Sequence, residues 1–172
     1  HLRNEDMPYR GCLYVGLMID HDGSPNVVEF NVRLGDPEAQ VTIPLIASDL
    51  GLALLAAAEG SLAETEVGFH DLNAATVVLA SEGYPSTPAT GRPISGWEAC
   101  IEEGQVSGFV HLAGAITGID GKLLSSGGRV LSATGIAPTL GEAIESSYQI
   151  IDGIELDGSH YRSDIGYRAL SR

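Results

Sequence analysis

The amino-acid sequence predicts an α+β protein in two parts. Residues 1–70 are expected to form an antiparallel hairpin plus helices, and residues 71–172 a small β-rich part with one packed helix. A turn signal between two apolar runs predicts the hairpin, and short apolar runs separated by glycine-rich turns predict the later strands. With 44% hydrophobic side chains over 172 residues, the chain can build one fair-sized core or two small ones.

The hairpin is predicted from the first apolar run, residues 12–19, which is typical of a strand covered on both faces. The pair Asp22-Gly23 marks a tight turn, so residues 27–33 are expected to return antiparallel. Because side chains alternate along a strand, this second strand has two unlike faces. One carries Val28, Phe30 and Val32, and the other carries Glu29, Asn31 and Arg33.

Two helices are predicted after the hairpin. The first is short and ends at Pro44, and the second spans residues 49–59. Ser48 is the expected N-cap of the second helix, and Gly60 stands where a left-handed C-cap belongs. Residues 61–71 are acidic and aperiodic, so the boundary between the two parts is placed near their end.

The second part is predicted to be mostly β-structure. One helical turn is expected over residues 97–101, and a longer helix begins where Thr139 and Glu142 form a capping box and ends at Gly153. The predicted strands span residues 74–80, 108–113, 122–125, 129–135 and 154–161.

The polar face of the second strand is a candidate metal site. Side chains two apart on a strand lie roughly 6.5–7 Å apart at the backbone. Glu29 and Asn31 can therefore converge on one hard cation, with Arg33 next in line for a phosphate or carboxylate oxygen. Magnesium takes one or two oxygen ligands from protein and the rest from water and substrate phosphates. The alternative is a solvated face of an edge strand, and the spacing alone favours neither.

A second candidate site is the glycine-rich segment of residues 125–129. Gly127 and Gly128 allow backbone amides to approach an anion, and Arg129 can fork onto a phosphate. The spacing is not that of a P-loop. The simpler interpretation is a hairpin turn whose glycines are chosen for their φ angle. The residues by themselves favour that simpler interpretation.

Composition excludes several classes of partner. The formal net charge of −14 argues against nucleic acid and anionic membrane surfaces, and no apolar run is long enough to span a bilayer. Lys122 is the only lysine, so a polyphosphate would be held by arginines, backbone amides and metal. Cys12 and Cys100 have no metal or redox spacing, which indicates a reducing compartment. His111 lies in an apolar strand and is predicted to be a hydrogen-bonded core or rim histidine rather than a catalytic one.

The segment Glu29–Gln40, EFNVRLGDPEAQ, resembles the last motif of the ATP-grasp domain in the phosphoribosylamine–glycine ligase (glycinamide ribonucleotide synthetase) family. The preceding segment, residues 9–18, is similar to the strand before that motif. Three more segments are similar to motifs of the family's C-terminal domain and follow in the same order: residues 83–85, 127–130 and 162–166. The resemblance therefore spans nearly the whole chain. It departs from the family at Leu34, where Phe is usual, and at residues 112–115, where His-Ala-Gly-Thr is usual.

The resemblance implies an enzyme of purine synthesis in the cytoplasm. Residues 1–70 would be the C-terminal portion of an ATP-grasp domain, and residues 71–172 the β-rich C-terminal domain. The enzyme would join glycine to 5-phosphoribosylamine through a glycyl phosphate, converting ATP to ADP and phosphate. The adenine pocket and the nucleotide-binding lysines would lie upstream. The segment alone would then be inactive, with the missing N-terminal part of the same chain as its partner.

The resemblance also implies roles for individual residues. Glu29 and Asn31 would hold Mg²⁺ or Mn²⁺ on the ATP phosphates. Arg33 would steady a phosphate or the glycyl carboxylate, and Asp36 would orient an amino group. The ribose phosphate would face a further set, Gly127, Gly128 and Arg129. Two alternatives stay open: another ATP-grasp carboxylate–amine ligase, or a non-catalytic acidic module that binds a partner through the polar face of residues 29–33.

Overall fold

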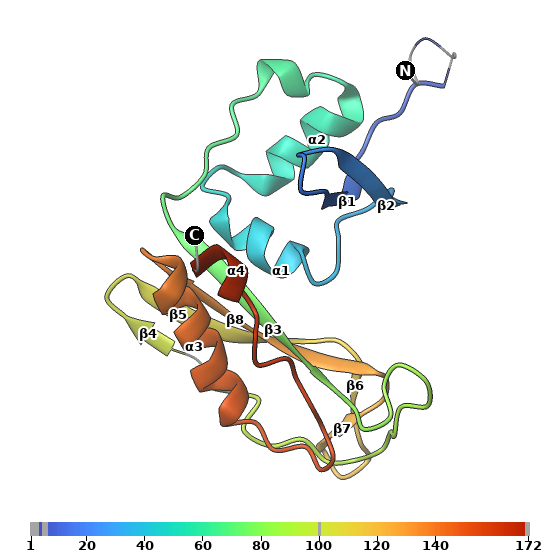
Figure 1. Ribbon diagram of the computed structural model, residues 1–172, viewed down its shortest axis with the longest axis vertical. Helices are drawn as coiled ribbons and strands as arrows, with labels where there is room; N and C mark the ends of the chain where they lie inside the picture. The colour runs from blue at the N-terminus through green and yellow to red at the C-terminus, as the bar shows by residue number, and fades with distance from the viewer. Residues whose placement is uncertain (1–3, 5–6, 100, 171–172) are drawn as a thin grey trace. The chain divides into compact units, whose positions relative to one another are not determined.

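The computed structural model describes residues 4, 7–99 and 101–170. The chain divides into two compact units, residues 1–70 and 71–172 (Figure 1). Each unit contains antiparallel strands and a few helices, which confirms the predicted α+β class. Cys100 lies outside the described residues, whereas Cys12 is a free thiol.

The first unit opens with the predicted hairpin. Strand β1, Tyr14–Ile19, pairs antiparallel with β2, Pro25–Asn31. The turn between them uses Gly23 at φ +88°, a left-handed conformation that glycine adopts without steric cost. Register shifts within the pair, so that Val28 forms a β-bulge on β2.

The prediction that the first strand is covered on both faces is wrong for the structure described. The side chains of Leu17 and Met18 are 49% and 59% exposed, and that of Phe30 on β2 is 62% exposed. An apolar run predicts a strand that can be covered, but it does not identify the element that covers it. Within the described residues of this unit, the hairpin remains largely open to solvent.

The second strand is also shorter than predicted, because it ends at Asn31 rather than at residue 33. Asn31 pairs with Tyr14, the first residue of β1, so the ladder has no further partner to continue. The carbonyl of Val32 instead accepts a hydrogen bond from the Tyr9 hydroxyl at 3.2 Å. Arg33 therefore lies in a loop and not in the strand.

Short helices follow the hairpin in the first unit. Helix α1, Ala39–Thr42, runs into the 3₁₀ helix η2, Ile43–Leu45, which contains Pro44. Helix α2 spans Leu50–Glu59 and is followed by the 3₁₀ helix η3, Leu62–Glu64. Both predicted helices are therefore present.

The caps of α2 are only partly as predicted. Gly60 closes the helix at φ +85°, as expected. The N-cap is Asp49, whose carboxylate accepts a hydrogen bond from the Leu52 N–H at 3.0 Å. Ser48, the predicted cap, accepts instead from the Gly68 N–H at 2.7 Å. Its hydroxyl therefore ties two loops together.

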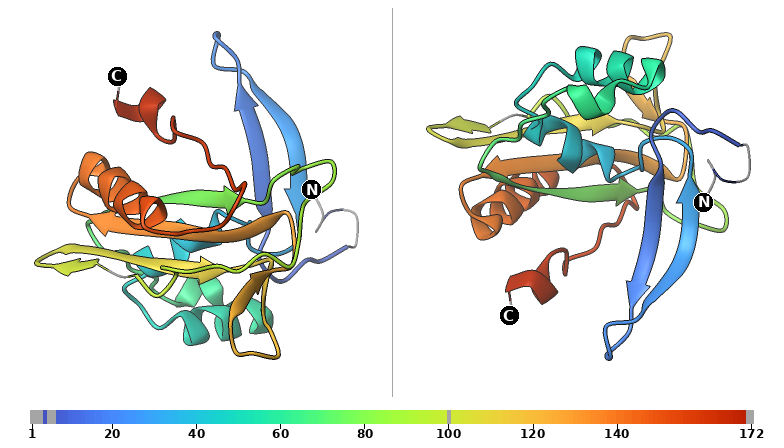
Figure 2. Two further views of the ribbon diagram at one scale, coloured as in Figure 1. Left: turned by 90° about the horizontal axis from the view of Figure 1, so that it is seen from below. Right: turned by 90° about the horizontal axis from the view of Figure 1, so that it is seen from above.

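The second unit is built on a four-stranded antiparallel sheet in the order β3-β8-β5-β4. Its strands are β3, Asn73–Ala80; β4, Ile101–Glu103; β5, Val106–Leu112; and β8, Arg129–Ala137. Helix α3 packs on one face of this sheet, as Figure 2 shows. The core lies between helix and sheet and includes Val77, Leu131 and Ile151, each at most 1% exposed.

A small second sheet and an extended segment complete this unit. Strands β6, Ala115–Thr117, and β7, Leu123–Ser125, form an antiparallel pair. Residues 154–161 do not form the predicted strand; isolated bridges at Glu155 and His160 hold them in place. The helical turn predicted over residues 97–101 is also wrong, because Ile101 already belongs to β4.

Helix α3, Leu140–Asp152, begins with the predicted capping box. The Glu142 N–H donates to the Thr139 hydroxyl at 3.3 Å, and the Thr139 N–H donates to the Glu142 carboxylate at 3.1 Å. Gly153 ends the helix, as predicted. On the buried face, the Ser147 hydroxyl accepts from the Gly135 N–H at 2.9 Å, which anchors the helix to the central strand β8.

The C-terminal motif of residues 162–166 is held against α3 by hydrogen bonds. The Tyr148 hydroxyl donates to the Arg162 carbonyl at 2.7 Å and accepts from the Ile165 N–H at 3.1 Å. Gly166, at φ +79°, lies where a Cβ would overlap the side chain of Ile144. The short helix α4, Tyr167–Leu170, follows. Across the described part of the chain, no helix has the length and apolarity needed to cross a bilayer.

Candidate functional site

The oxygen-donor row, which we define as Glu29 and Asn31, lies on one face of the hairpin. Glu29 pairs with Gly16 and Asn31 pairs with Tyr14, and directly paired residues share a face of an antiparallel sheet. Gly16 makes room for Glu29, because a Cβ there would lie 3.2 Å from the Glu29 Cγ. The bulge at Val28 precedes the row and leaves the alternation between Glu29 and Asn31 intact.

Two further polar residues adjoin the row, and the sequence did not single them out as site residues. The Tyr14 hydroxyl donates to the Glu38 carboxylate at 3.1 Å. This hydrogen bond raises the pKa of Tyr14, and burial and the negative charges of Glu38 and Glu29 raise it further. Tyr14 therefore stays protonated, as a hydrogen-bond donor. The only signal in the sequence was the acidic residue that closes the Gly-Asp-Pro-Glu turn.

Arg33 and Asp36 lie in the loop between β2 and α1. The prediction that Arg33 continues the row is wrong, because the strand ends at Asn31; its guanidinium donates to the Leu34 carbonyl at 2.8 Å. Asp36 is exposed and accepts a hydrogen bond from the Gln40 side chain at 3.3 Å. The two predicted catalytic groups thus follow the row along the chain but do not extend it.

The donor row fits a hard cation that brings other ligands with it. A carboxylate and an amide oxygen share one exposed face, and both are hard donors. Among the described residues, no group of three or more His, Cys, Asp or Glu side chains could hold a metal. The row therefore does not fit a closed structural zinc centre. It fits magnesium or manganese completed by water and phosphate oxygens.

The glycine-rich segment is shaped by close packing. The Ser81 N–H and hydroxyl donate to the Gly128 and Gly127 carbonyls, each at 2.8 Å. A Cβ on Gly128 would overlap the ring of Tyr84. Neither glycine has a positive φ, so the interpretation as a turn with φ-selected glycines is wrong. The structure thus brings together two of the motifs, residues 83–85 and 127–130. Arg129 opens strand β8 opposite Ala80 and is exposed.

His111 lies on β5 directly opposite Ser132. Its Nδ1 is 3.4 Å from the Thr134 hydroxyl, and its ring meets that of Phe109 edge-on at 5.0 Å between centroids. Burial lowers the pKa of His111 below its ordinary value of 6.5. These contacts match the interpretation of a hydrogen-bonded rim histidine.

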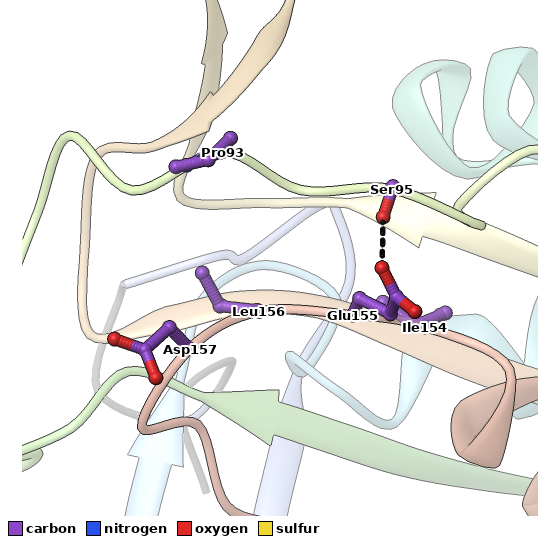
Figure 3. Close-up of a pocket in the computed structure, with 6 residues that line it drawn as sticks. All are labelled: Pro93, Ser95, Ile154, Glu155, Leu156 and Asp157. Carbon is purple, nitrogen blue, oxygen red and sulfur yellow. Dashed lines mark hydrogen bonds between the residues drawn. The ribbon is translucent and has the colours of Figure 1, made fainter.

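Two surface pockets in the second unit contain none of the predicted site residues. One, of about 520 Å³, lies between residues 93–95 and 154–157 (Figure 3). Its Glu155 carboxylate accepts from the Ser95 hydroxyl at 2.9 Å, so the one polar pair drawn there ties the two segments together. The other, of about 600 Å³, is lined by Trp97 and Lys122 among others.

The fold and the donor row define a two-unit α+β protein with a candidate divalent-cation site on its first unit. Two family models match the chain. "Phosphoribosylglycinamide synthetase, C domain" matches residues 74–168, and "Phosphoribosylglycinamide synthetase, ATP-grasp (A) domain" matches residues 1–39. The chain belongs to the phosphoribosylglycinamide synthetase family, which confirms the resemblance seen in the sequence.

Named relatives agree with this assignment. Phosphoribosylamine–glycine ligase from Chlorobaculum tepidum is 46% identical over 170 residues, which cover 98% of this chain and 39% of that protein. A crystal structure of phosphoribosylamine–glycine ligase from Thermotoga maritima is 38% identical with a TM-score of 0.77, over 95% of this chain and 39% of that one. The chain thus spans about two fifths of the length of these relatives.

A more distant likeness concerns the fold alone. The biotin carboxylase domain of the Hydrogenobacter thermophilus 2-oxoglutarate carboxylase has a TM-score of 0.55 at 16% identity, over 91% of this chain and 34% of that one. That domain was crystallised with ADP and magnesium.

Proposed function

We propose that the chain is the C-terminal part of a phosphoribosylamine–glycine ligase acting in the cytoplasm. The enzyme joins glycine to 5-phosphoribosylamine and converts ATP to ADP and phosphate. Residues 1–70 form the end of its ATP-grasp domain, and residues 71–172 form its C-terminal domain. The observation that carries the proposal is the donor row, two oxygen ligands on one face of the hairpin, in a chain of this family.

The first unit would bind the ATP phosphates. The Glu29 carboxylate and the Asn31 amide oxygen would hold Mg²⁺ or Mn²⁺ there. When bound, the cation neutralises negative charge on the phosphate oxygens. The Arg33 guanidinium steadies the transferring phosphoryl group or the glycyl carboxylate as charge develops. Asp36 accepts a hydrogen bond from the attacking amine and orients it.

The chemistry proceeds in two balanced steps. A carboxylate oxygen of glycine attacks the γ-phosphorus of ATP, and the bond from that phosphorus to the bridging oxygen breaks to release ADP. The amine nitrogen of 5-phosphoribosylamine then attacks the acyl carbon of glycyl phosphate. The carbon–oxygen bond to phosphate breaks, phosphate leaves, and the nitrogen loses a proton as the amide forms. Positioning of the reacting groups supplies much of the rate.

The glycine-rich segment binds the ribose phosphate in this proposal. Both glycine carbonyls face Ser81. In a trans peptide the N–H points opposite to the carbonyl. The Gly128 N–H therefore faces away from Ser81 and is available to an anion. Arg129, an exposed residue at the start of β8, would add a forked pair of donors beside it.

Isotope transfer tests the reaction type directly. The complete ligase that carries this segment is supplied with glycine labelled with ¹⁸O in its carboxylate, together with ATP and 5-phosphoribosylamine. We expect one labelled oxygen to appear in inorganic phosphate, since the acyl phosphate oxygen leaves with phosphorus. Unlabelled phosphate contradicts the glycyl phosphate. Labelled phosphate formed without 5-phosphoribosylamine, but with another amine, indicates a different carboxylate–amine ligase.

A further inference from the structure

Both carboxylate oxygens of Glu38 have close neighbours. One of its carboxylate oxygens accepts from the Tyr14 hydroxyl at 3.1 Å. The other lies against Gly35, where a Cβ would overlap it. Gly35 is buried and does not have a positive φ, so a Cβ there would displace the Glu38 side chain rather than strain the backbone.

The contacts of Glu38 join the donor row to the loop that follows it. Tyr14 pairs with Asn31, so the hydrogen bond to Glu38 begins on the residue beside a proposed metal ligand. Glu38 is also the N-cap of α1, and its carbonyl accepts from the Thr42 N–H and hydroxyl, each at 3.0 Å. The contact between Tyr14 and Glu38 therefore connects the two ends of the loop that carries Arg33 and Asp36, because Tyr14 pairs with the residue before the loop and Glu38 follows it.

We propose that Glu38 is a positioning residue, which acts through Tyr14 to hold Asn31 and through α1 to hold the loop of Arg33 and Asp36, without itself binding the cation. This inference rests on the proposed function, because it assigns the geometry of the same site. The residue is neither part of the donor row nor one of the predicted catalytic groups.

The geometry of the contact supports this role. The Tyr14 hydroxyl must donate for the contact to persist, and a Glu38 carboxylate oxygen accepts from it at 3.1 Å. A side-chain amide at position 38 would still offer an oxygen acceptor of the same reach, whereas a methyl group would not.

The test uses three variants of the complete ligase that carries this segment: Tyr14→Phe, Glu38→Ala and Glu38→Gln. Glycine-dependent ADP formation is measured against magnesium concentration and against ATP. We expect Tyr14→Phe and Glu38→Ala to lower kcat about 10- to 100-fold, or to raise the magnesium concentration needed for half-maximal rate by a similar factor. Substitutions of residues that orient metal ligands have effects of this size. Glu38→Gln should stay close to the unchanged enzyme, because its amide oxygen still accepts from Tyr14.

A steric variant disturbs the same contact without changing either of its two residues. Gly35→Ala places a methyl group where the Glu38 carboxylate lies, so it should reproduce the defect of Glu38→Ala. Gly141→Ala is the matched control, since a Cβ there has nothing within 4 Å. Tyr148→Phe is the control for the phenol, because it removes two hydrogen bonds in the second unit and should lower thermal stability with no change in magnesium dependence.

Three outcomes overturn the inference. Glu38→Gln as defective as Glu38→Ala shows that the charge of the carboxylate is needed, as for a metal ligand. Tyr14→Phe and Glu38→Ala that lower only the melting temperature show a purely structural contact. If the enzyme without any substitution shows no ADP formation that depends on glycine and 5-phosphoribosylamine, the proposed function itself is wrong, and the variants need not be compared.

Discussion

The two units of the chain differ in how far the apolar residues of their strands are buried. In the second unit, Val77 and Val130 are fully buried between a sheet and its helix. In the first, the strands carry comparable residues, yet Val27 and Phe30 are 55% and 62% exposed. The candidate site of the first unit thus lies on a hairpin that the described residues leave largely exposed, whereas the sheet of the second unit is covered by a helix.

The largest expected effect is on the free energy of unfolding, when one strand leucine in each unit is shortened to alanine. Leu131→Ala empties a core position that is 1% exposed, and we expect it to cost about 2–5 kcal/mol of unfolding free energy. Leu17→Ala on β1, where the side chain is 49% exposed, should change it by less than about 0.5 kcal/mol. Urea unfolding followed by circular dichroism measures both. Equal losses would show that the hairpin is packed after all.

The same contrast explains what the sequence could predict. Strand β8 and helix α3 were predicted from local signals: an apolar run after two glycines for the strand, and the capping box of Thr139 and Glu142 for the helix. Strands β4 and β6 were not, because each has only three residues, and each is defined by its pairing in a local hairpin rather than by an apolar pattern of its own. Short strands of this kind carry too little periodicity to be recognised.

The candidate site divides in the same way. The position of Glu29 and Asn31 on one face of β2 follows from strand alternation and was predictable from their spacing. The contact of Tyr14 with Glu38 was not, since it joins residues 24 apart through a loop whose path the sequence does not specify. The end of β2 before Arg33 was missed for a related reason, because it depends on where the partner strand begins.

A smaller effect is expected from pH, and it should be confined to the second unit. Burial lowers the pKa of His111 in the folded state below 6.5, so the unfolded chain binds that proton more readily. The stabilising contribution is present above pH 6.5 and is lost as the pH falls through the lowered value. Thermal unfolding between pH 8 and pH 5 should therefore show a decline that His111→Gln reduces.

The matched control for this pH experiment is His21→Gln, which changes an exposed histidine in the turn of the hairpin. It should leave the pH profile of the second unit unchanged. A profile that responds to His21→Gln and not to His111→Gln would contradict the assignment of this pH dependence to the rim of the β5–β8 pair.

The central claim is that the open hairpin of the first unit carries the metal ligands of a glycine-activating ligase. Its most direct test is glycine- and 5-phosphoribosylamine-dependent ADP formation by the complete ligase with Glu29→Gln, compared with Glu64→Gln at an exposed position of η3 in the same unit. We predict that Glu29→Gln abolishes turnover with the fold intact and that Glu64→Gln leaves it unchanged. Unchanged turnover in Glu29→Gln would remove Glu29 from the metal site and contradict the account.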